Sequence, residues 1–525
     1  MAFDHAGDFN DQLYRALKQS PWWMISIGVH VLLFVISGLM GTESPIAAKA
    51  TPAAIEMTKA EDLPDVQQPD EPQVDPLVAD DIHATEPTIV DTPLQADKPE
   101  TDINFDHNDV YGNVLDGKGM GDFVGVANNP DIGIGGGQAA GGHGLGSLRT
   151  AGSRGKRGRP DSERAVDDAL QWLAAHQSPD GAWEAEGFGR WCDRKPATAG
   201  PDGAGKATYD VGVSGLALLA FLGAGYTQRS DGPYGDVVRR GLRWMVNTQD
   251  AEGCFGARTS GHFVYNHAVA SLAVVEAYAM SGSTMLKNPA QKALDFIALA
   301  RNPYFAWRYG VKPGDNDTSV TGWMMMALKS AKMVTEADVA AGRKPSLQLD
   351  ADAFDGIKTW IEKMTDPDTG RVGYQQRGSG PARPTELVDR FPADRSEAMT
   401  AVGVLARVFL GEDPKSSPAI EKGVRLMAER LPVWDAASGG TDMYYWYYAT
   451  LALFQVGGPA WKAWDGAMKS AIVGTQRRDG DYCGYKGSWD PIDPWGADGG
   501  RVYATAVNAM CLEVYYRYGR VFGTK

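Results

Sequence analysis

Two carboxylates stand two positions apart in the stretch GDNDTSV, Gly314–Val320, directly before a long apolar run. A carboxyl group can donate or accept a proton in catalysis when its pKa suits the task. We therefore take Asp315 and Asp317 as the candidate catalytic pair. An Asp just before a helix also caps it by accepting backbone N–H bonds, which is the alternative role of Asp317.

Other polar residues recur at or near the starts of the apolar runs. If these runs are parallel helices, their N-termini open on one rim and the polar groups converge there. Helix capping is the alternative role. Tyr444, Trp446, Tyr447, Trp489 and Trp495 are the aromatic residues near this rim that could stack on a sugar or peptide. The candidate ligand-binding residues are Asp210, His267, Glu397, Asp442, Tyr445 and Arg501.

The apolar runs that must position these residues occur six times, about 50 to 56 residues apart with one longer interval. Each run is apolar on all sides, which is typical of a buried helix, and a more amphipathic run precedes it. The pattern predicts six helix pairs in two concentric rings, with the apolar helices inside. The apolar runs begin at Asp210, Asn266, Asp317, Ser396, Tyr444 and Val502.

A short motif separates the two helices of a pair. HQSPDGAW, His176–Trp183, recurs as TQDAEGCFG from Thr248, loosely as TDPDTGRVGY from Thr365, and as TQRRDGDYCGY from Thr475. This pattern resembles the prenyltransferase and squalene-oxidase repeat of the terpenoid-cyclase and protein-prenyltransferase toroids. The resemblance covers residues 161–525 and implies an all-α fold, an (α/α)6 toroid.

The catalytic motifs of those families are only partly present. Class II terpene cyclases carry Asp-x-Asp-Asp-Thr, whose middle Asp protonates an alkene. Alignment on Asp317-Thr318 places Asn316 at the proton donor, and an amide cannot supply that proton. A shifted register would use Asp315 with Asp317. Protein prenyltransferases bind zinc through Asp-x-Cys and a distant His, whereas Cys192 and Asp193 are adjacent here, so we expect no metal and no cofactor.

An N-terminal segment suggests a membrane anchor. Trp23–Met40 contains no charged residue over 18 positions, about the length that spans a bilayer. Arg15 and Lys18 precede it, which predicts a single-pass inner-membrane protein with a cytoplasmic N-terminus and a periplasmic C-terminal domain. A cleaved signal peptide, with its site near Ala48–Ala50, is the alternative.

Ser26 and His30 share one helical face within this segment. A histidine inside a membrane is costly and is by default a candidate functional residue. The Ser-x-x-x-His spacing, followed by an acidic proline-rich tether, resembles the energy transducer TonB. That resemblance implies a coupling role for Ser26 and His30 and a motor partner of ExbB and ExbD type. A histidine that simply pairs with Ser26 near the interface is the alternative.

Two linkers separate the anchor from the repeats. Residues 41–105 hold 15 of the 66 acidic residues but 3 of the 51 basic ones, together with nine prolines, which predicts an extended linker. The formal net charge of −15 argues against a nucleic-acid partner. The four cysteines do not indicate a disulfide scaffold. We predict a leader at 1–22, the transmembrane anchor at 23–40, an acidic linker at 41–110, a glycine-rich linker at 111–160 and the toroid at 161–525.

From these features we expect a membrane-anchored, non-catalytic protein that binds a hydrophobic, glycan or peptide ligand and couples to a proton-motive complex. The alternative is a squalene or terpene cyclase-like or glycan-active enzyme. The insertion Arg377–Arg395 interrupts the repeat with Pro and Gly and suggests a lid or a partner-binding loop.

Overall fold

The computed structural model describes residues 161–197, 200–437 and 439–517, and these residues form twelve α-helices. Their high helical content agrees with the all-α prediction. The helices are α4 (Asp161–Ala175), α5 (Asp210–Gly223), α6 (Pro233–Asn247), α7 (Phe263–Ser281), α8 (Thr284–Ala300), α9 (Thr318–Ala340), α10 (Asp352–Met364), α11 (Ala398–Phe409), α12 (Pro418–Ala428), α13 (Met443–Val456), α14 (Gly458–Val473) and α15 (Gly496–Arg517).

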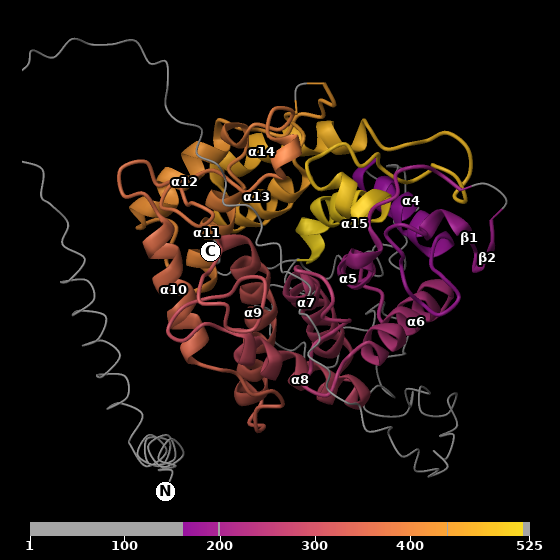
Figure 1. Cartoon of the computed structure of the whole chain (residues 1–525), viewed down its shortest axis with the longest axis horizontal. Coiled ribbons are helices and arrows are strands. Elements are labelled where there is room, and N and C mark those ends of the chain that lie inside the picture. Colours follow the sequence, from indigo (N-terminus) through magenta and orange to yellow (C-terminus); the bar gives the residue numbers. More distant parts are fainter. Residues whose placement is uncertain (1–160, 198–199, 438, 518–525) are drawn as a thin grey trace, which may run out of the picture. The chain divides into compact units, whose positions relative to one another are not determined.

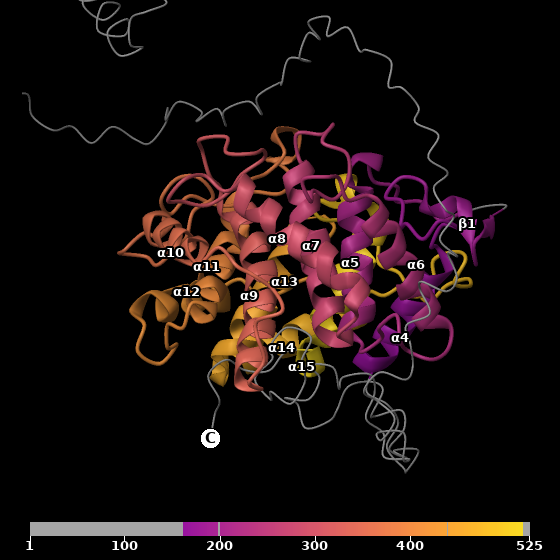
Figure 2. The same ribbon diagram turned by 90° about the horizontal axis from the view of Figure 1, so that it is seen from below.

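Six of these helices form a closed inner ring. Helices α5, α7, α9, α11, α13 and α15 pack against one another in that order, and α15 packs against α5 to close the ring. Figure 2 shows α5, α7 and α9 side by side. The other six helices alternate with them and pack on their outer side. The predicted toroid of six helix pairs is therefore confirmed for the described residues (Figure 1).

Burial explains which helices lie inside. Helix α7 buries every residue from Asn266 to Ser281, because it has neighbours on all sides. The outer helix α12 buries only Ile420, Gly423 and Met427, which share one face at the helical spacing. The apolar and amphipathic runs of the sequence thus correspond to inner and outer helices.

The glutamine of the repeated motif ties one helix pair to the next. Gln177 Nε2 donates to the carbonyl of Gly181 in its own turn, at 2.9 Å, and to that of Val237 in α6, at 3.0 Å. Gln249 makes the equivalent bonds to Gly253 and to Pro289 in α8. The motif is therefore a structural connection and not an active site.

A tryptophan fixes three of the turns between an outer and an inner helix. The Trp183 indole donates to the Leu173 carbonyl at 2.7 Å, and the Trp183 backbone N–H donates to Ser214 Oγ on α5 at 2.9 Å. Trp307 makes the same two kinds of bond in the third repeat, a turn that the motif search did not recognise. In the last repeat the equivalent residue is Trp489, beyond the stretch aligned from Thr475.

Small elements complete the described structure. Strands β1 (Trp191–Cys192) and β2 (Lys195–Pro196) form an antiparallel pair. The insertion at Arg377–Arg395 contains the 3-10 helices η3 (Thr385–Leu387) and η4 (Ala393–Arg395). The remaining 3-10 helices of the described residues are η1 (Phe188–Arg190) and η2 (Ala207–Tyr209).

The predicted membrane anchor Trp23–Met40, with Ser26 and His30, lies outside the described residues, as do both linkers. Within the part that is described, no helix combines the length and apolar character needed to cross a bilayer. The anchor and its coupling role therefore remain predictions.

Candidate active site on the N-terminal rim of the ring

Residues at the N-terminal ends of several inner helices contact one another. The Asn266 side chain at the start of α7 donates to the Thr208 carbonyl, which precedes α5, at 2.7 Å. The hydroxyls of Ser319 in α9 and Tyr444 in α13 lie 2.8 Å apart. Residues from four inner helices or their entries thus meet on one rim of the ring.

Asp317 is the most deeply buried carboxylate of this rim. One of its oxygens caps α9 by accepting the Val320 N–H at 2.7 Å. The other oxygen, Oδ2, has no partner within hydrogen-bond distance. Burial raises the pKa of Asp317 to about 7, although the Val320 N–H and the nearby Arg308 oppose this shift. Asp317 is therefore both a helix cap and a carboxylic acid that can carry a proton near neutral pH.

Arg308 brings the two candidate catalytic carboxylates together. Its Nη1 pairs with Asp315, which is exposed, and its Nε lies 4.0 Å from Asp317 Oδ2. That Nε is also buried without a hydrogen-bond partner. Arg308 and Asp317 thus form a long ion pair in which neither facing atom makes a hydrogen bond, and a polar atom of a ligand can complete this arrangement.

Tyrosine hydroxyls surround Asp317. Tyr309 and Tyr374 lie 2.9 Å apart through their hydroxyl oxygens, and both side chains are partly exposed. Burial, followed by the charges of nearby acidic groups, raises the pKa of each tyrosine well above its usual value. Both hydroxyls therefore stay protonated and can donate or accept hydrogen bonds next to the carboxylate.

Aromatic rings fill the centre of the ring below this rim. The Trp323 ring stacks on Tyr447 at 5.5 Å between centroids and meets Tyr448 edge-on at 5.4 Å. Its indole N–H donates to the Tyr265 hydroxyl at 2.7 Å. Tyr444 lies against Tyr448 at 5.0 Å. The predicted stacking residues Tyr444 and Tyr447 thus belong largely to a packed centre.

The structure adds a second buried acid, Asp493, which the sequence analysis missed. Its Oδ2 accepts the Met443 N–H at 3.1 Å and the Tyr503 hydroxyl at 2.8 Å. Burial, and then the negative charge of Asp442, raises the pKa of Asp493 to about 7. The only sequence signal was an Asp-Pro pair before α15, which begins at Gly496, ahead of the apolar run that we had used to define it.

Asn316 takes the position of the cyclase proton donor but has a structural role. Its side-chain oxygen accepts the Ala306 N–H and the Asn302 amide, both at 3.0 Å. The Asn302 amide also donates to the Asp315 carbonyl at 2.5 Å. These bonds fix the loop before α9 and so orient Asp315 and Asp317.

Two of the candidate ligand-binding residues, His267 and Tyr445, use their polar atoms in hydrogen bonds to backbone groups. His267 Nδ1 accepts the Phe255 N–H at 3.1 Å, and its Nε2 lies 3.2 Å from the Ala293 carbonyl. Burial lowers the pKa of His267 to about 3, so the ring stays neutral. The Tyr445 hydroxyl donates to the Met427 and Arg430 carbonyls. Neither group is available to a ligand in this arrangement.

Two others are held in ion pairs. Glu397 accepts from Arg371 Nε at 3.1 Å and from the Thr400 hydroxyl at 2.8 Å. Asp442 caps α13 and forms a buried pair with Arg383 of the insertion at 2.6 Å. The insertion is therefore anchored on the rim through Arg383, beside the acid Asp493.

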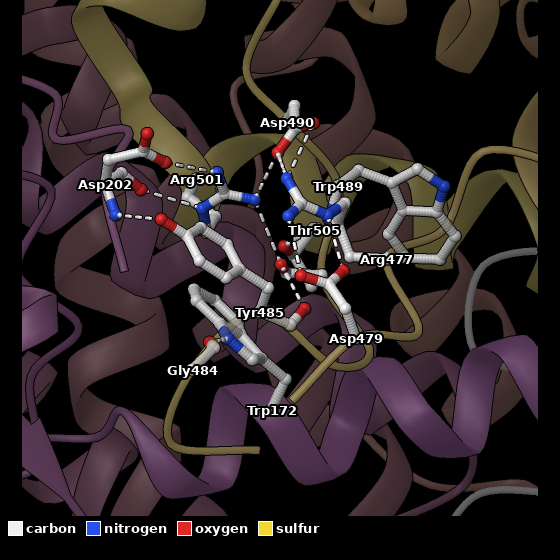
Figure 3. A network of polar contacts seen from close by, with 11 residues as sticks. Trp172, Asp202, Arg477, Asp479, Gly484, Tyr485, Trp489, Asp490, Arg501 and Thr505 are labelled. Carbon is white, nitrogen blue, oxygen red and sulfur yellow. Dashed lines mark hydrogen bonds and ion pairs between the residues drawn. The ribbon is translucent and has the colours of Figure 1, made fainter. Parts of the chain in front are cut away.

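Asp210 and Arg501 complete the set. Asp210 accepts the Ala185 N–H at 2.7 Å, and burial raises its pKa to about 6. Arg501 is buried between Asp202 and Asp490 (Figure 3).

Two of the predicted stacking residues, Trp446 and Trp489, are buried in the hydrophobic core. The Trp489 indole N–H donates to the Ile472 carbonyl.

No protein-family model matches this chain, and no curated protein matches its sequence. Among solved structures, an alpha-1,6-mannanase from Salegentibacter sp. HEL1_6 is 10% identical over 68% of this chain and 99% of its own, with a TM-score of 0.45. The type II terpene cyclase MstE from Scytonema is 12% identical over 68% of this chain and 97% of its own, with a TM-score of 0.41. A novel alpha-amylase from Clostridium perfringens is 11% identical over 67% and 98%, with a TM-score of 0.41.

These similarities are too low to assign an activity. The described residues define an α/α toroid through the contacts between their own helices.

Proposed function

We propose that the toroid is a glycan-active enzyme whose substrate binds at the tyrosine-rich rim. Asp317 serves as the general acid, Asp315 as the carboxylate that activates water, and Arg308 holds both in place. Glycoside hydrolysis uses a pair of carboxyl groups, one as the general acid and one as the base or nucleophile.

Two buried atoms that lack hydrogen bonds, one on Arg308 and one on Asp317, support this proposal. Arg308 Nε and Asp317 Oδ2 are 4.0 Å apart, and both lack a hydrogen-bond partner. A sugar oxygen can accept from the first and receive a proton from the second. Because both atoms are buried, a substrate reaches them only after neighbouring side chains move, and Tyr374, which interacts with the Asp317 carboxyl group, is one such neighbour.

The packed centre favours a glycan over an isoprenoid. A long apolar chain needs a deep apolar cavity to fold in, whereas Trp323, Tyr447 and Tyr448 contact one another where such a cavity would lie. The rim above them presents hydroxyls, carboxyls and aromatic faces, which suit a hydroxyl-rich ligand.

The experiment is turnover of a panel of α- and β-linked oligosaccharides, labelled at the reducing end, by the full-length protein. Asp317→Asn should abolish turnover, and Asp315→Asn should lower it at least about 100-fold, because each change removes one proton-transfer group. Asp231→Asn, an exposed site on another loop, is the matched control. Absence of turnover by the wild type on every glycan would refute the enzymatic role, as would full activity in Asp317→Asn.

A second candidate function rests on the N-terminal sequence. Ser26 and His30 stand four apart within the uncharged stretch Trp23–Met40, which supports a non-catalytic, membrane-anchored protein that couples to ExbB- and ExbD-type motor subunits. His30→Ala should then abolish function in cells, and motor subunits should no longer co-purify with the variant. An active His30→Ala protein without any motor partner would exclude this role.

A further inference from the structure

The ring has one junction that the polypeptide does not bridge. Consecutive helix pairs are joined by the chain at the other five junctions, whereas the last repeat meets the first only through side chains and packing. We call this junction the seam, formed by α4, the loop segments 176–197 and 200–209, the turn 474–495 and α15.

The turn of the last repeat docks onto α4 across the seam. The Trp172 indole donates to the Gly484 carbonyl at 2.8 Å, and the Tyr482 hydroxyl donates to Asp168 at 2.6 Å. Gln476, the motif glutamine of this repeat, donates to the Ala165 carbonyl at 2.7 Å. The closing junction thus uses the same kind of glutamine bond that Gln177 and Gln249 make at the first two junctions, with added side-chain contacts.

A buried arginine network lies beside these contacts. Arg501 binds Asp202 of the first repeat at 2.8 Å and Asp490 of the last at 2.7 Å (Figure 3). Its guanidinium carbon lies 4.8 Å from the centre of the Tyr485 ring, and that of Arg477 lies 4.3 Å from the same ring. Arg501 therefore links both sides of the seam electrostatically.

A disulfide between Cys192 and Cys483 also crosses the seam. The two cysteines are 291 residues apart in sequence, and their Cα atoms are 5.3 Å apart, within the usual range of about 4.4 to 6.8 Å. Cys192 ends β1 in the first repeat, and Cys483 directly precedes the Gly484 that docks on α4. This bond supplies the covalent connection that the chain lacks.

The other two cysteines of the described part are chemically different. Cys254 and Cys511 are free and fully buried, and burial raises the pKa of Cys254 to about 12 and that of Cys511 further still. Thiolates are the reactive species, so these two thiols are inert. Cys192 and Cys483 are partly exposed and open to exchange.

We propose that the Cys192–Cys483 disulfide is a redox latch that closes the ring. It forms by exchange with the disulfide of a dithiol oxidoreductase: the two thiols lose two protons and two electrons as the S–S bond forms, and the oxidoreductase becomes a dithiol. Because α15 carries Tyr503 and follows Asp493, reduction loosens the seam and with it one wall of the rim.

Full-length protein purified without reductant tests this latch. Peptide mapping by mass spectrometry should recover a linked peptide pair containing Cys192 and Cys483. Tris(2-carboxyethyl)phosphine should lower Tm by about 5 °C and speed hydrogen exchange in residues 161–175 and 476–490 but not in α7. Cys192→Ser should lower Tm similarly and remove the response to reductant, whereas Cys254→Ser should retain it.

Several results would overturn the latch. Free thiols at both positions in the unreduced protein would do so, as would a Tm that reductant leaves unchanged. Stoichiometric zinc would also do so, because the Asp193 carboxylate lies within 4.8 Å of both sulfur atoms and the reduced pair could use it as a third ligand. Zinc content is measured by plasma mass spectrometry on the same sample.

Discussion

Arg308 Nε lies 4.0 Å from Asp317 Oδ2, and neither atom has a hydrogen-bond partner within the described structure. The same guanidinium pairs with Asp315 through Nη1. One side chain therefore positions a buried acid, Asp317, whose pKa burial raises to about 7, and an exposed carboxylate, Asp315. The loop before α9, which carries all three residues, is therefore the candidate catalytic site.

Replacing Arg308 should uncouple the two carboxylates. Arg308→Lys keeps the positive charge but loses the planar fork that addresses Asp315 and Asp317 together. We expect kcat to fall about 10- to 100-fold on a glycan that the wild type cleaves, with little change in Tm. Steady-state kinetics provide the measurement, and unaltered kcat in Arg308→Lys would contradict the positioning role.

Stability should fall as pH rises because Asp493 is buried. Its pKa is raised from 3.8 to about 7 in the folded protein. Between pH 4 and pH 7 the folded state therefore holds more protons than the unfolded state. The stability that Asp493 contributes is fully present below about pH 4 and is lost as pH rises through about 7.

Calorimetric Tm at pH 5 and pH 8 measures this effect. The fall in Tm between the two values should be smaller in Asp493→Asn than in the wild type, whatever the absolute Tm of the variant. An equal fall in Tm between pH 5 and pH 8 in both proteins would show that Asp493 does not titrate in this range.

The glutamine at the seam should matter for folding. Gln476→Ala leaves the buried Ala165 and Gly487 carbonyls without their donor, and should lower the free energy of unfolding by about 2 kcal/mol. Gln376→Ala, at an exposed position, serves as the matched control and should cost almost nothing. Urea unfolding followed by fluorescence reports both values, and equal effects would remove the special role of Gln476.

The buried pair Arg383–Asp442 anchors the insertion. Arg383→Met leaves the Asp442 charge buried and unpaired, and should lower the free energy of unfolding by about 3 to 5 kcal/mol. Asp442→Asn in the same chain removes that charge but retains the cap on α13, so the double variant should recover part of the loss. A double-mutant cycle from denaturant titrations gives the coupling energy, and simple additivity would mean that the pair is not coupled.

Much of the fold could be predicted because it repeats. Apolar runs with caps such as Asp317 specify buried helices, and the glutamines Gln177, Gln249 and Gln476 mark three of the turns where pairs connect. Trp307 was missed because its turn lacks the motif glutamine. The structure shows that its indole still makes the conserved kind of bond to the preceding outer helix.

The site was less predictable because it depends on distant partners. Asp315 and Asp317 are visible as a local pair, whereas the role of Arg308 requires the geometry of the loop. His267 was placed at the rim by its position, but packing against α8 commits its ring to backbone groups.

Long-range pairs escaped the sequence analysis altogether. Cys192 and Cys483 are 291 residues apart, and only closure of the ring brings them together. Arg383 and Asp442 are likewise joined through an insertion whose path no periodicity specifies. Such contacts follow from the tertiary arrangement and not from local spacing.

The pH profile of kcat/KM on a cleaved glycan tests the central claim most directly. If Asp317 is the general acid, the wild-type profile falls above a pKa of about 7, the value to which burial raises this carboxyl group. Asp317→Asn should remove that limb together with nearly all activity, and Asp231→Asn should retain both. A profile with no fall above pH 7, or the same fall in an active Asp317→Asn variant, would contradict the assignment.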